Sequence, residues 1–287
     1  RMNVGTKDLV IHTDQPKGKM VKVLFEPNAK LEDSLTYDIT AWSIPYAHGF
    51  KAIASKTKVK SRNDVIVGVV FNKPDKSAYA YLAKWNSLED ATFLAEALNA
   101  GIRVRFAEQD FTIEGGTFKK GSLVILRHDN RQADFDDKLI AIANKNVRVL
   151  KPVKTGFVDA GKDFGSYGVN PINKQKVALL SGEGTSSLGF GEVWHFFEQQ
   201  LHYPVTVIDT DYFNRVNMDQ FDVLIIPNGY YGRVLNKSGL EKVTKFAQGG
   251  GTVIAIGNAL RSFANKDGFA LKTKTSNNKE KPAPNLT

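Results

Sequence analysis

A short histidine and glutamate motif is one candidate for chemistry in this sequence. His195, Glu198 and His202 recur at i, i+3 and i+7, so on a helix they would share one face, where imidazole and carboxylate groups could hold a zinc ion. Tyr203 and Pro204 end that helix directly afterwards and leave His202 poorly fixed. The favoured interpretation is therefore a helix that buries its apolar side and holds no metal.

Loops rich in glycine and polar residues supply a second set of candidates. In open α/β sheets, ligands bind beyond the carboxyl ends of the strands, where helix N-termini offer free backbone N–H groups. Three loops here each follow a strand-like apolar run, so we expect them to cluster at one end of the sheet. One hypothesis is that they form a small polar pocket for a sugar, a peptide end or an anion. The favoured interpretation is that they are tight turns, which glycine and serine permit whether or not anything binds. The candidate ligand-binding residues are Ser181, Glu183, Thr185, Asn228, Tyr230 and Asn258.

The turn at residues 255–259 is where a sheet of this kind would present a nucleophile. A nucleophile on such a strand-to-helix turn is activated by a histidine. The turn contains Gly257 and Asn258 but neither Cys nor Ser, and no histidine follows it. The chain also has no cysteine at all, which excludes thiolate nucleophiles, thiolate metal sites and disulfides. The sequence therefore predicts no catalytic residue.

The elements that would position these residues occur twice in the same order. Apolar periodicity and helix-capping signals predict strand–helix–strand–strand–helix–strand in each half of the chain. In the first half the expected elements are Tyr79–Ala83, Leu88–Ala100, Ile102–Ala107, Ser122–Arg127, Phe135–Asn144 and Val147–Leu150. In the second half they are Lys176–Leu180, Gly191–Leu201, Val205–Asp209, Asp222–Pro227, Lys237–Gln248 and Thr252–Ile256.

This recurrence predicts an α/β protein with two tandem doubly wound, flavodoxin-like units, each built on a parallel sheet. The alternative is that two unrelated α/β domains give similar patterns at this level of detail. A β-rich segment, residues 1–75, is expected to precede the two units, with strands at Met20–Phe25 and Asp64–Phe71. The first unit spans residues 76–170, and the stretch Gly156–Asn173 is expected to be a linker or an ordered loop. The second spans residues 171–271, and a polar tail covers residues 272–287.

The formal net charge of +9 raises the question of an anionic partner. The densest basic run, Lys51–Arg62, alternates charged and uncharged residues like a solvated strand, and no aromatic residues interleave to stack bases. We therefore expect no nucleic-acid partner. No run approaches the roughly 20 apolar residues of a membrane span, so no transmembrane segment is expected. Residues 1–18 contain no signal peptide, which predicts either a cytosolic protein or an internal fragment.

Two stretches of the sequence carry a resemblance to a known family. One is Asp33–Tyr46, DSLTYDITAWSIPY, and the other combines SGEG at 181–184 with GFGEVWHFFE at 189–198. Both resemble the region downstream of the peptidase domain in large bacterial zinc carboxypeptidases of the carboxypeptidase A superfamily, over roughly Asp8 to Leu271. The resemblance implies a secreted or periplasmic protein. It also implies a class I glutamine-amidotransferase-like fold for the second half.

The resemblance further implies a non-catalytic accessory region, whose partners are an upstream peptidase domain of the same polypeptide and a peptide or glycan. Zinc would belong to that peptidase domain, and no cofactor is expected in this part of the chain. His195-Phe-Phe-Glu198 matches the family's His-x-x-Glu motif, but the second family histidine lies a domain away and no histidine follows His202. The alternatives are a free-standing amidotransferase-like hydrolase, a ligand-binding domain, or a metal-dependent peptidase that uses His195 and Glu198.

Overall fold

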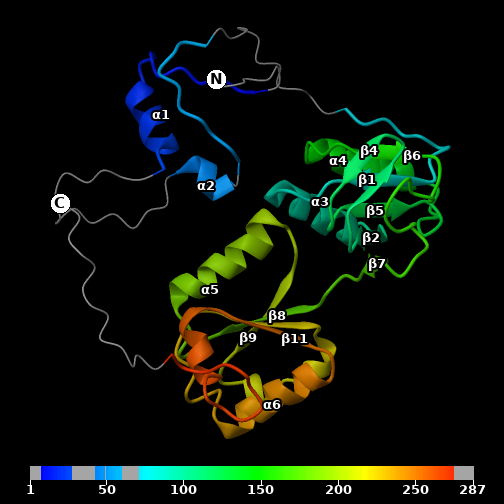
Figure 1. The fold of residues 1–287 in the computed structure, drawn as a ribbon. Helices are drawn as coiled ribbons and strands as arrows, with labels where there is room; N and C mark the ends of the chain where they lie inside the picture. The colour runs from blue at the N-terminus through cyan, green and yellow to red at the C-terminus, as the bar shows by residue number, and fades with distance from the viewer. Residues whose placement is uncertain (1–7, 28–42, 49, 60–70, 275–287) are drawn as a thin grey trace. The chain divides into compact units, whose positions relative to one another are not determined.

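The computed structural model describes residues 8–27, 43–48, 50–59 and 71–274 (Figure 1). The chain divides into two compact units, residues 1–68 and 69–287. The predicted strand at Asp64–Phe71 lies outside the described residues except for Phe71. Most of the sequence stretch Asp33–Tyr46 and most of the polar tail also lie outside them.

The described part of residues 1–68 contains two helices, and the expected β-rich character is not found there. Helices α1 (Gly18–Phe25) and α2 (Ile44–His48) are its elements, so the predicted strand at Met20–Phe25 is wrong. The backbone N–H of Val21 donates to the carbonyl of Lys17, which is the helical pattern. A short apolar run does not distinguish a helix from a buried strand, which explains the error. The described part of the lysine run, up to residue 59, contains a bend instead of the expected strand.

The larger compact unit, residues 69–287, begins with a five-stranded sheet, sheet A, in the order β6-β1-β5-β2-β7. Every pairing in it is antiparallel, so the prediction of a parallel sheet in the first half is wrong. Two helices, α3 and α4, contribute buried apolar residues to the same core cluster as its strands. The elements are β1 (Ala80–Ala83), α3 (Leu88–Asn99), β2 (Val104–Ala107), β5 (Leu123–Leu126), α4 (Phe135–Lys145), β6 (Lys151–Val153) and β7 (Val169–Ile172).

The connection from β2 to β5 explains the antiparallel arrangement. It contains a hairpin, β3 (Phe111–Ile113) and β4 (Gly116–Phe118), and no helix. Neighbouring parallel strands need a crossover connection, usually through a helix, whereas antiparallel strands do not. Glu114 and Gly115 form the two-residue turn with φ of 46° and 70°, the left-handed conformation that such hairpins use. The sequence therefore carried a hairpin signal that the predicted strand order left out.

One further expectation about this region needs correction, and an alternative left open by the sequence is decided. The strand expected at Val147–Leu150 starts later, as β6, because Val147 has φ of 53° and ends helix α4 in a turn. Of the two alternatives for Gly156–Asn173, the structure shows the ordered loop, which is part of the sheet A region. Phe164 within it is completely buried and packs edge-on against Phe111, and the segment ends in β7, which pairs with β2.

Sheet C, the four-stranded sheet of the second half, is parallel throughout, as predicted. Its order is β11-β10-β8-β9. The first strand of this sheet in the sequence, β8, therefore lies between the second, β9, and the third, β10. The predicted boundaries of α6 match the structure at both ends, and Asn236 caps this helix by accepting the N–H of Gly239. The elements are β8 (Val177–Ser181), α5 (Ser187–Trp194), β9 (Val205–Asp209), β10 (Val223–Ile226), α6 (Lys237–Gln248) and β11 (Thr252–Ala255), with short 3-10 turns at Phe213–Arg215, Met218–Gln220 and Gly257–Ser262.

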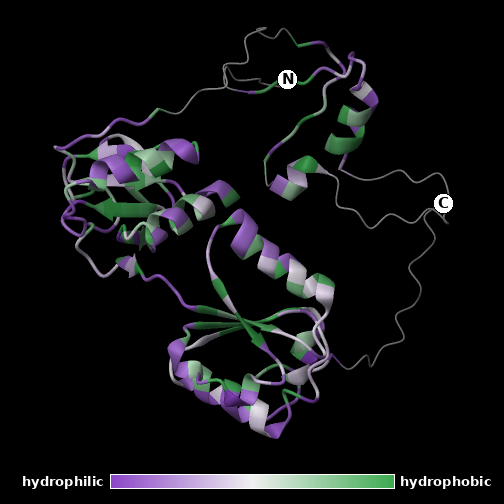
Figure 2. Cartoon of the chain, turned by 180° about the vertical axis from the view of Figure 1, so that it is seen from behind, coloured by the Kyte–Doolittle hydropathy of each residue, from purple (hydrophilic) through white to green (hydrophobic). Residues whose placement is uncertain are grey.

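Helices cover both faces of sheet C, so its strands are largely apolar (Figure 2). Helix α6 packs on one face, and α5 with its continuation packs on the other. That continuation, His195–Gln200, is a π-helix in which the Leu201 N–H donates to the carbonyl of Phe196. The wider turn lets Phe196 and Phe197 both join the core cluster on this face. The predicted single α-helix over Gly191–Leu201 is thus an α-helix that starts earlier and ends as a π-helix.

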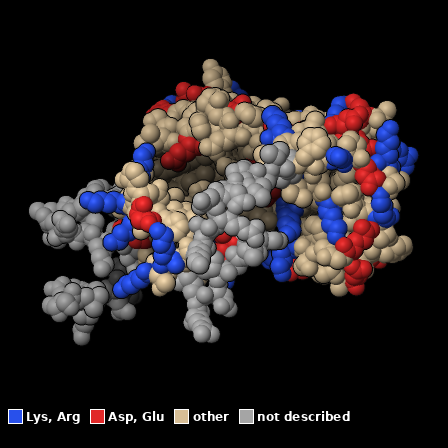
Figure 3. All heavy atoms as spheres, turned by 90° about the horizontal axis from the view of Figure 1, so that it is seen from above, with Lys and Arg blue, Asp and Glu red and all other residues tan. Residues whose placement is uncertain are grey.

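The distribution of surface charge and the length of the helices bear on possible partners. On the face shown in Figure 3, basic and acidic side chains are interspersed at the right of the picture, whereas basic side chains predominate at the left. Within the described chain, no helix combines the length and the apolar character needed to cross a bilayer.

Candidate functional site

The structure brings the three predicted loops together at the carboxyl edge of sheet C. We call this edge the crest and define it as residues 181–187, 209–215, 228–233 and 257–261, which follow β8, β9, β10 and β11 in turn. All six candidate ligand-binding residues lie on it. The loop after β9 also belongs to the crest, although sequence reasoning did not include it. The same rule, that ligands sit beyond the carboxyl ends of parallel strands, would have identified it.

The loops after β8 and β10 are joined by backbone hydrogen bonds. The N–H of Ser186 donates to the carbonyl of Asn228 over 2.9 Å, and the N–H of Tyr230 donates to the carbonyl of Gly184 over 2.8 Å. Thr185 and Gly229 form an antiparallel bridge between these two contacts. The crevice between the neighbouring strands β8 and β10 is therefore spanned by main chain, and the side chains of the two loops are carried on a rigid base.

Two glycines make this close approach of the loops sterically possible. A Cβ atom on Gly229 would lie 2.3 Å from the carbonyl oxygen of Gly184, and a Cβ on Gly184 would lie 2.4 Å from the carbonyl oxygen of Tyr230. Real side chains do not approach a carbonyl this closely. The glycines of these loops thus have a structural role, as the interpretation that they are only tight turns would require, and they also fix the positions of Thr185 and Tyr230.

The turn after β11 meets the same base through an amide side chain. The Oδ1 atom of Asn228 accepts the backbone N–H of Asn258 over 2.9 Å. Gly257 has φ of 60° and sits where the chain turns sharply from strand to 3-10 helix. In α/β hydrolases a sharp strand-to-helix turn carries the nucleophile, whereas this turn has Gly257, a residue with no side chain.

Charged and aromatic side chains project from this base. Glu183 forms an ion pair with Arg233, and both are well exposed. The guanidinium of Arg261 lies 5.8 Å from the ring centroid of Tyr230. The loop after β9 repeats this arrangement, with Arg215 5.7 Å from the ring centroid of Tyr212.

A buried hydroxyl and a carboxylate lie beside the loop after β8. A Cβ on Gly182 would lie 2.7 Å from the Thr210 hydroxyl and 2.8 Å from a carboxylate oxygen of Asp209. Thr210 is only 5% exposed, and its hydroxyl has no hydrogen-bond partner among the residues that the structure describes. The second oxygen of Asp209 accepts the N–H of Asp211 over 2.8 Å. This part of the crest thus offers a carboxylate oxygen of the exposed Asp209 to a polar molecule, whereas the Thr210 hydroxyl is enclosed by the protein.

The structure does not bring the histidine and glutamate motif together as a metal site. Glu198 accepts the backbone N–H of Val205 over 3.1 Å, which ties the π-helix to the next strand. His202 has φ of 50° and lies beyond the helix end, while the π-helical geometry of residues 195–200 removes the expected i, i+3, i+7 face. Within the described ranges, no group of three or more His, Cys, Asp or Glu side chains is placed to hold a metal ion.

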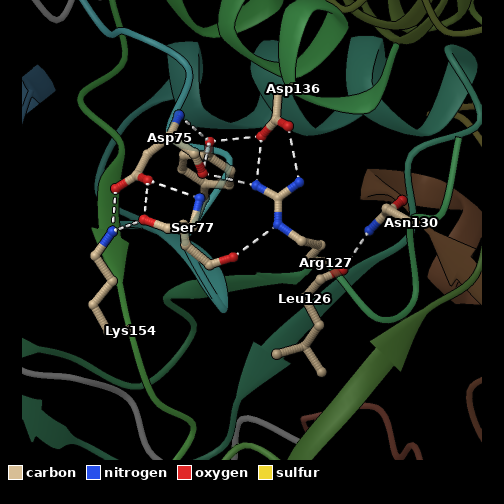
Figure 4. A network of polar contacts seen from close by, with 9 residues as sticks. Asp75, Ser77, Leu126, Arg127, Asn130, Asp136 and Lys154 are labelled. Carbon is tan, nitrogen blue, oxygen red and sulfur yellow. Dashed lines mark hydrogen bonds and ion pairs between the residues drawn. The ribbon is translucent and has the colours of Figure 1, made fainter. Parts of the chain in front are cut away.

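A separate polar network lies beside sheet A (Figure 4). Arg127 donates to both carboxylate oxygens of Asp136, over 2.7 and 2.8 Å, and to the backbone carbonyls of Asp75 and Ala78. The hydroxyl of Tyr81 donates to Asp136 over 2.7 Å. The Arg127 guanidinium lowers the pKa of Asp136, while burial and the bond to Asp136 raise the pKa of Tyr81 to about 12. These contacts attach the segment that precedes β1 to the sheet, which indicates a structural role.

An open groove of about 660 Å³ lies next to this network. Asp75 and Tyr81 contribute to its wall, but most of the lining is apolar. No sequence pattern predicted this groove, because its residues come from four separate stretches of the chain. The lining residues are Phe71, Asn72, Lys73, Pro74, Asp75, Tyr81, Ile140, Val149, Leu150 and Pro152.

Comparison with known proteins gives no relative for this chain. No family model matches it, and neither a curated protein nor a solved structure does so.

Proposed function

We propose that this chain is a non-catalytic accessory region of a secreted or periplasmic zinc metallocarboxypeptidase, and that the crest of sheet C is its binding surface. The turn after β11 carries the proposal. At the position where related folds present a reactive side chain, this chain has Gly257, and the neighbouring Asn258 uses its backbone N–H to hold Asn228. The crest is thus arranged to present polar side chains on a fixed base.

The strand order of sheet C supports a more specific fold assignment than a parallel α/β sheet. Counted from the β9 edge, the strand order of sheet C is 2-1-3-4 in chain order, which is the order of flavodoxin-like sheets. We propose a flavodoxin-like, class I glutamine-amidotransferase-like domain for residues 171–271. The resemblance of SGEG at 181–184 and GFGEVWHFFE at 189–198 to the accessory region of zinc carboxypeptidases supports this assignment.

In this proposal zinc belongs to a peptidase domain of the same polypeptide, which would be the principal partner of this region. The crest would add affinity for a peptide or a glycan near the peptidase. The coding sequence that precedes Arg1 tests the parentage. We expect a His-x-x-Glu motif followed by a distant histidine, and an unrelated upstream sequence would contradict the parentage.

The absence of catalysis is tested with the purified chain. We expect no release of C-terminal amino acids from a mixture of peptides and no hydrolysis of glutamine, with or without added zinc, when products are followed by mass spectrometry. His195→Ala and Glu198→Ala serve as paired variants. Turnover by the parent chain that either substitution abolishes would contradict the proposal and favour the metal-dependent alternative.

A further inference from the structure

Two exposed tyrosines lie on the crest, one on each side of the loop after β8. Tyr230 follows β10 and is 66% exposed, and Tyr212 follows β9 and is 58% exposed. Both are anchored by their own backbone, since the N–H of Tyr230 donates to Gly184 and the N–H of Tyr212 donates to the carbonyl of Asp209. Large exposed aromatic rings on a fixed backbone are typical of recognition surfaces, because little conformational freedom is lost when a ligand stacks on them.

An arginine already lies over each of these two rings, so one side of the ring is occupied by protein. Arg261 lies over Tyr230, and Arg215 lies over Tyr212. The contact restricts the ring and increases the number of hydrogen-bond donors beside it, because a guanidinium carries five N–H groups. Each tyrosine thus combines a stacking surface with adjacent donors.

Hydrogen-bond acceptors lie in the loops of the crest beside these rings. One carboxylate oxygen of Asp209 faces Gly182 in the loop after β8, and Glu183 lies in the same loop. Asn228 and Asn258 add amide groups at the base of the loops after β10 and β11. Alternating donors and acceptors beside aromatic faces suit a ligand that has many hydroxyl groups and apolar C–H faces.

The charge of the crest excludes a strongly ionic ligand as the best fit. Its three carboxylates, Asp209, Asp211 and Glu183, are balanced by three guanidinium groups, those of Arg215, Arg233 and Arg261, so its formal charge is zero. The whole chain carries +9. A site that selects an anion or a cation would carry an excess of the opposite sign, because complementary potential provides selectivity.

We propose that the crest binds a neutral glycan, with Tyr212 and Tyr230 as two stacking positions and Asp209, Glu183 and the two asparagines as hydrogen-bonding groups. This inference rests on the proposed function and names the ligand class of the same surface. Strands β9 and β10 lie on either side of β8, so the loops that carry the tyrosines start about 10 Å apart. A ligand that contacts both rings is therefore an oligosaccharide and not a single sugar.

The experiment is isothermal titration of the 287-residue chain with three neutral hexasaccharides, cellohexaose, mannohexaose and chitohexaose. Parallel titrations use hexagalacturonate as an anionic glycan and a mixture of short peptides. We expect at least one neutral hexasaccharide to bind, and we expect Tyr212→Ala and Tyr230→Ala each to weaken binding by about tenfold through loss of a stacking contact. Both substitutions leave the backbone hydrogen bonds of the loops in place.

Tyr167→Ala is the matched control. Tyr167 is 78% exposed and has Lys162 5.0 Å from its ring centroid, but it lies outside the crest. Its removal leaves binding unchanged if the crest is the site. Neutral glycan binding that is insensitive to both crest substitutions overturns the inference. Binding of peptides or hexagalacturonate alone also overturns it but leaves a binding role for the crest, whereas no binding of any class overturns that role as well.

Discussion

Sheet A and sheet C were expected to be two parallel sheets of the same type, and they differ in the connections between their strands. In sheet C, helices α5 and α6 connect strands that run the same way, and the loops collect at one edge. In sheet A, the hairpin β3–β4 joins β2 to its antiparallel neighbour β5. In an antiparallel sheet, loops leave from both ends of the strands. In sheet C, unlike sheet A, four loops therefore meet at one end, the carboxyl ends of the strands.

The two regions also differ in what holds their loops. Beside sheet A, the segment before β1 is fixed by charged side chains, above all by Arg127 and Asp136. On the crest, the loops are fixed by backbone hydrogen bonds and by glycines that allow close approach. The exposed tyrosine rings of the crest and one carboxylate oxygen of Asp209 therefore take no part in holding the loops, whereas the charged side chains beside sheet A hold the segment before β1.

Removal of Asp136 is expected to have the largest effect on stability. Asp136→Ala leaves Arg127 without its bidentate partner and removes the shorter of the two hydrogen bonds that the Tyr81 hydroxyl donates, so we expect a loss of about 3 kcal/mol in the free energy of unfolding, measured by urea denaturation. Asp134→Ala is the control, because its ion pair with Lys138 is exposed to solvent, so its loss should change the stability very little. Equal effects of the two substitutions would contradict a structural role for the network.

The next prediction concerns Gly229, which allows the loops after β8 and β10 to approach closely. Gly229→Ala places a Cβ atom 2.3 Å from the carbonyl of Gly184, and we expect a loss of about 2 kcal/mol in stability as the loops separate. Gly232→Ala is matched within the same loop, because a Cβ there meets nothing within 4 Å. If Gly229→Ala is as stable as Gly232→Ala, the described bridge between the loops is wrong.

Alkaline pH is expected to weaken sheet A through Tyr81. The pKa of this group is about 12 in the folded chain, against about 10 for an unperturbed tyrosine, so the stability it contributes is fully present below about pH 10 and is lost as the pH rises to about 12. The loss amounts to about 2 kcal/mol in urea denaturation between these pH values. Tyr81→Phe removes the ionisable group, so its stability should decline less over this range, and an identical decline would refute the assignment.

Asn228 is expected to show a smaller effect at the crest. Asn228→Ala removes the acceptor of the Asn258 N–H, and we expect a loss of about 1 kcal/mol in unfolding free energy. Asn228→Asp retains an acceptor oxygen and should restore most of this stability. The same low stability in both variants would show that the contact does not hold the turn after β11.

The sequence predicted elements well where local signals are strong. Helix α3 was expected because Ser87 and acidic residues mark its start, and the structure contains a capping box between Ser87 and Asp90. Helix α6 has an equally clear cap in Asn236. Strand direction in sheet A was predicted wrongly, because direction depends on the connection between strands. The apolar pattern of the strands themselves is the same in either direction.

The candidate site shows the same limit. Polar residues after the strands identified three of the four loops, since the position of a residue after a strand can be read from the sequence. The bridge between Thr185 and Gly229 could not be predicted, because it is formed by backbone groups that every residue has. The stacking of Arg215 on Tyr212 and of Arg261 on Tyr230 depends on how each loop folds back, which single-residue patterns do not encode.

The most direct test of binding without chemistry at the crest is an NMR titration of the isotope-labelled chain with the neutral hexasaccharides and the peptide mixture. We predict amide shifts confined to residues 181–187, 209–215, 228–233 and 257–261, and a ligand that mass spectrometry recovers intact. Shifts located only beside sheet A, no shifts with any ligand, or a ligand that is recovered cleaved would contradict the account.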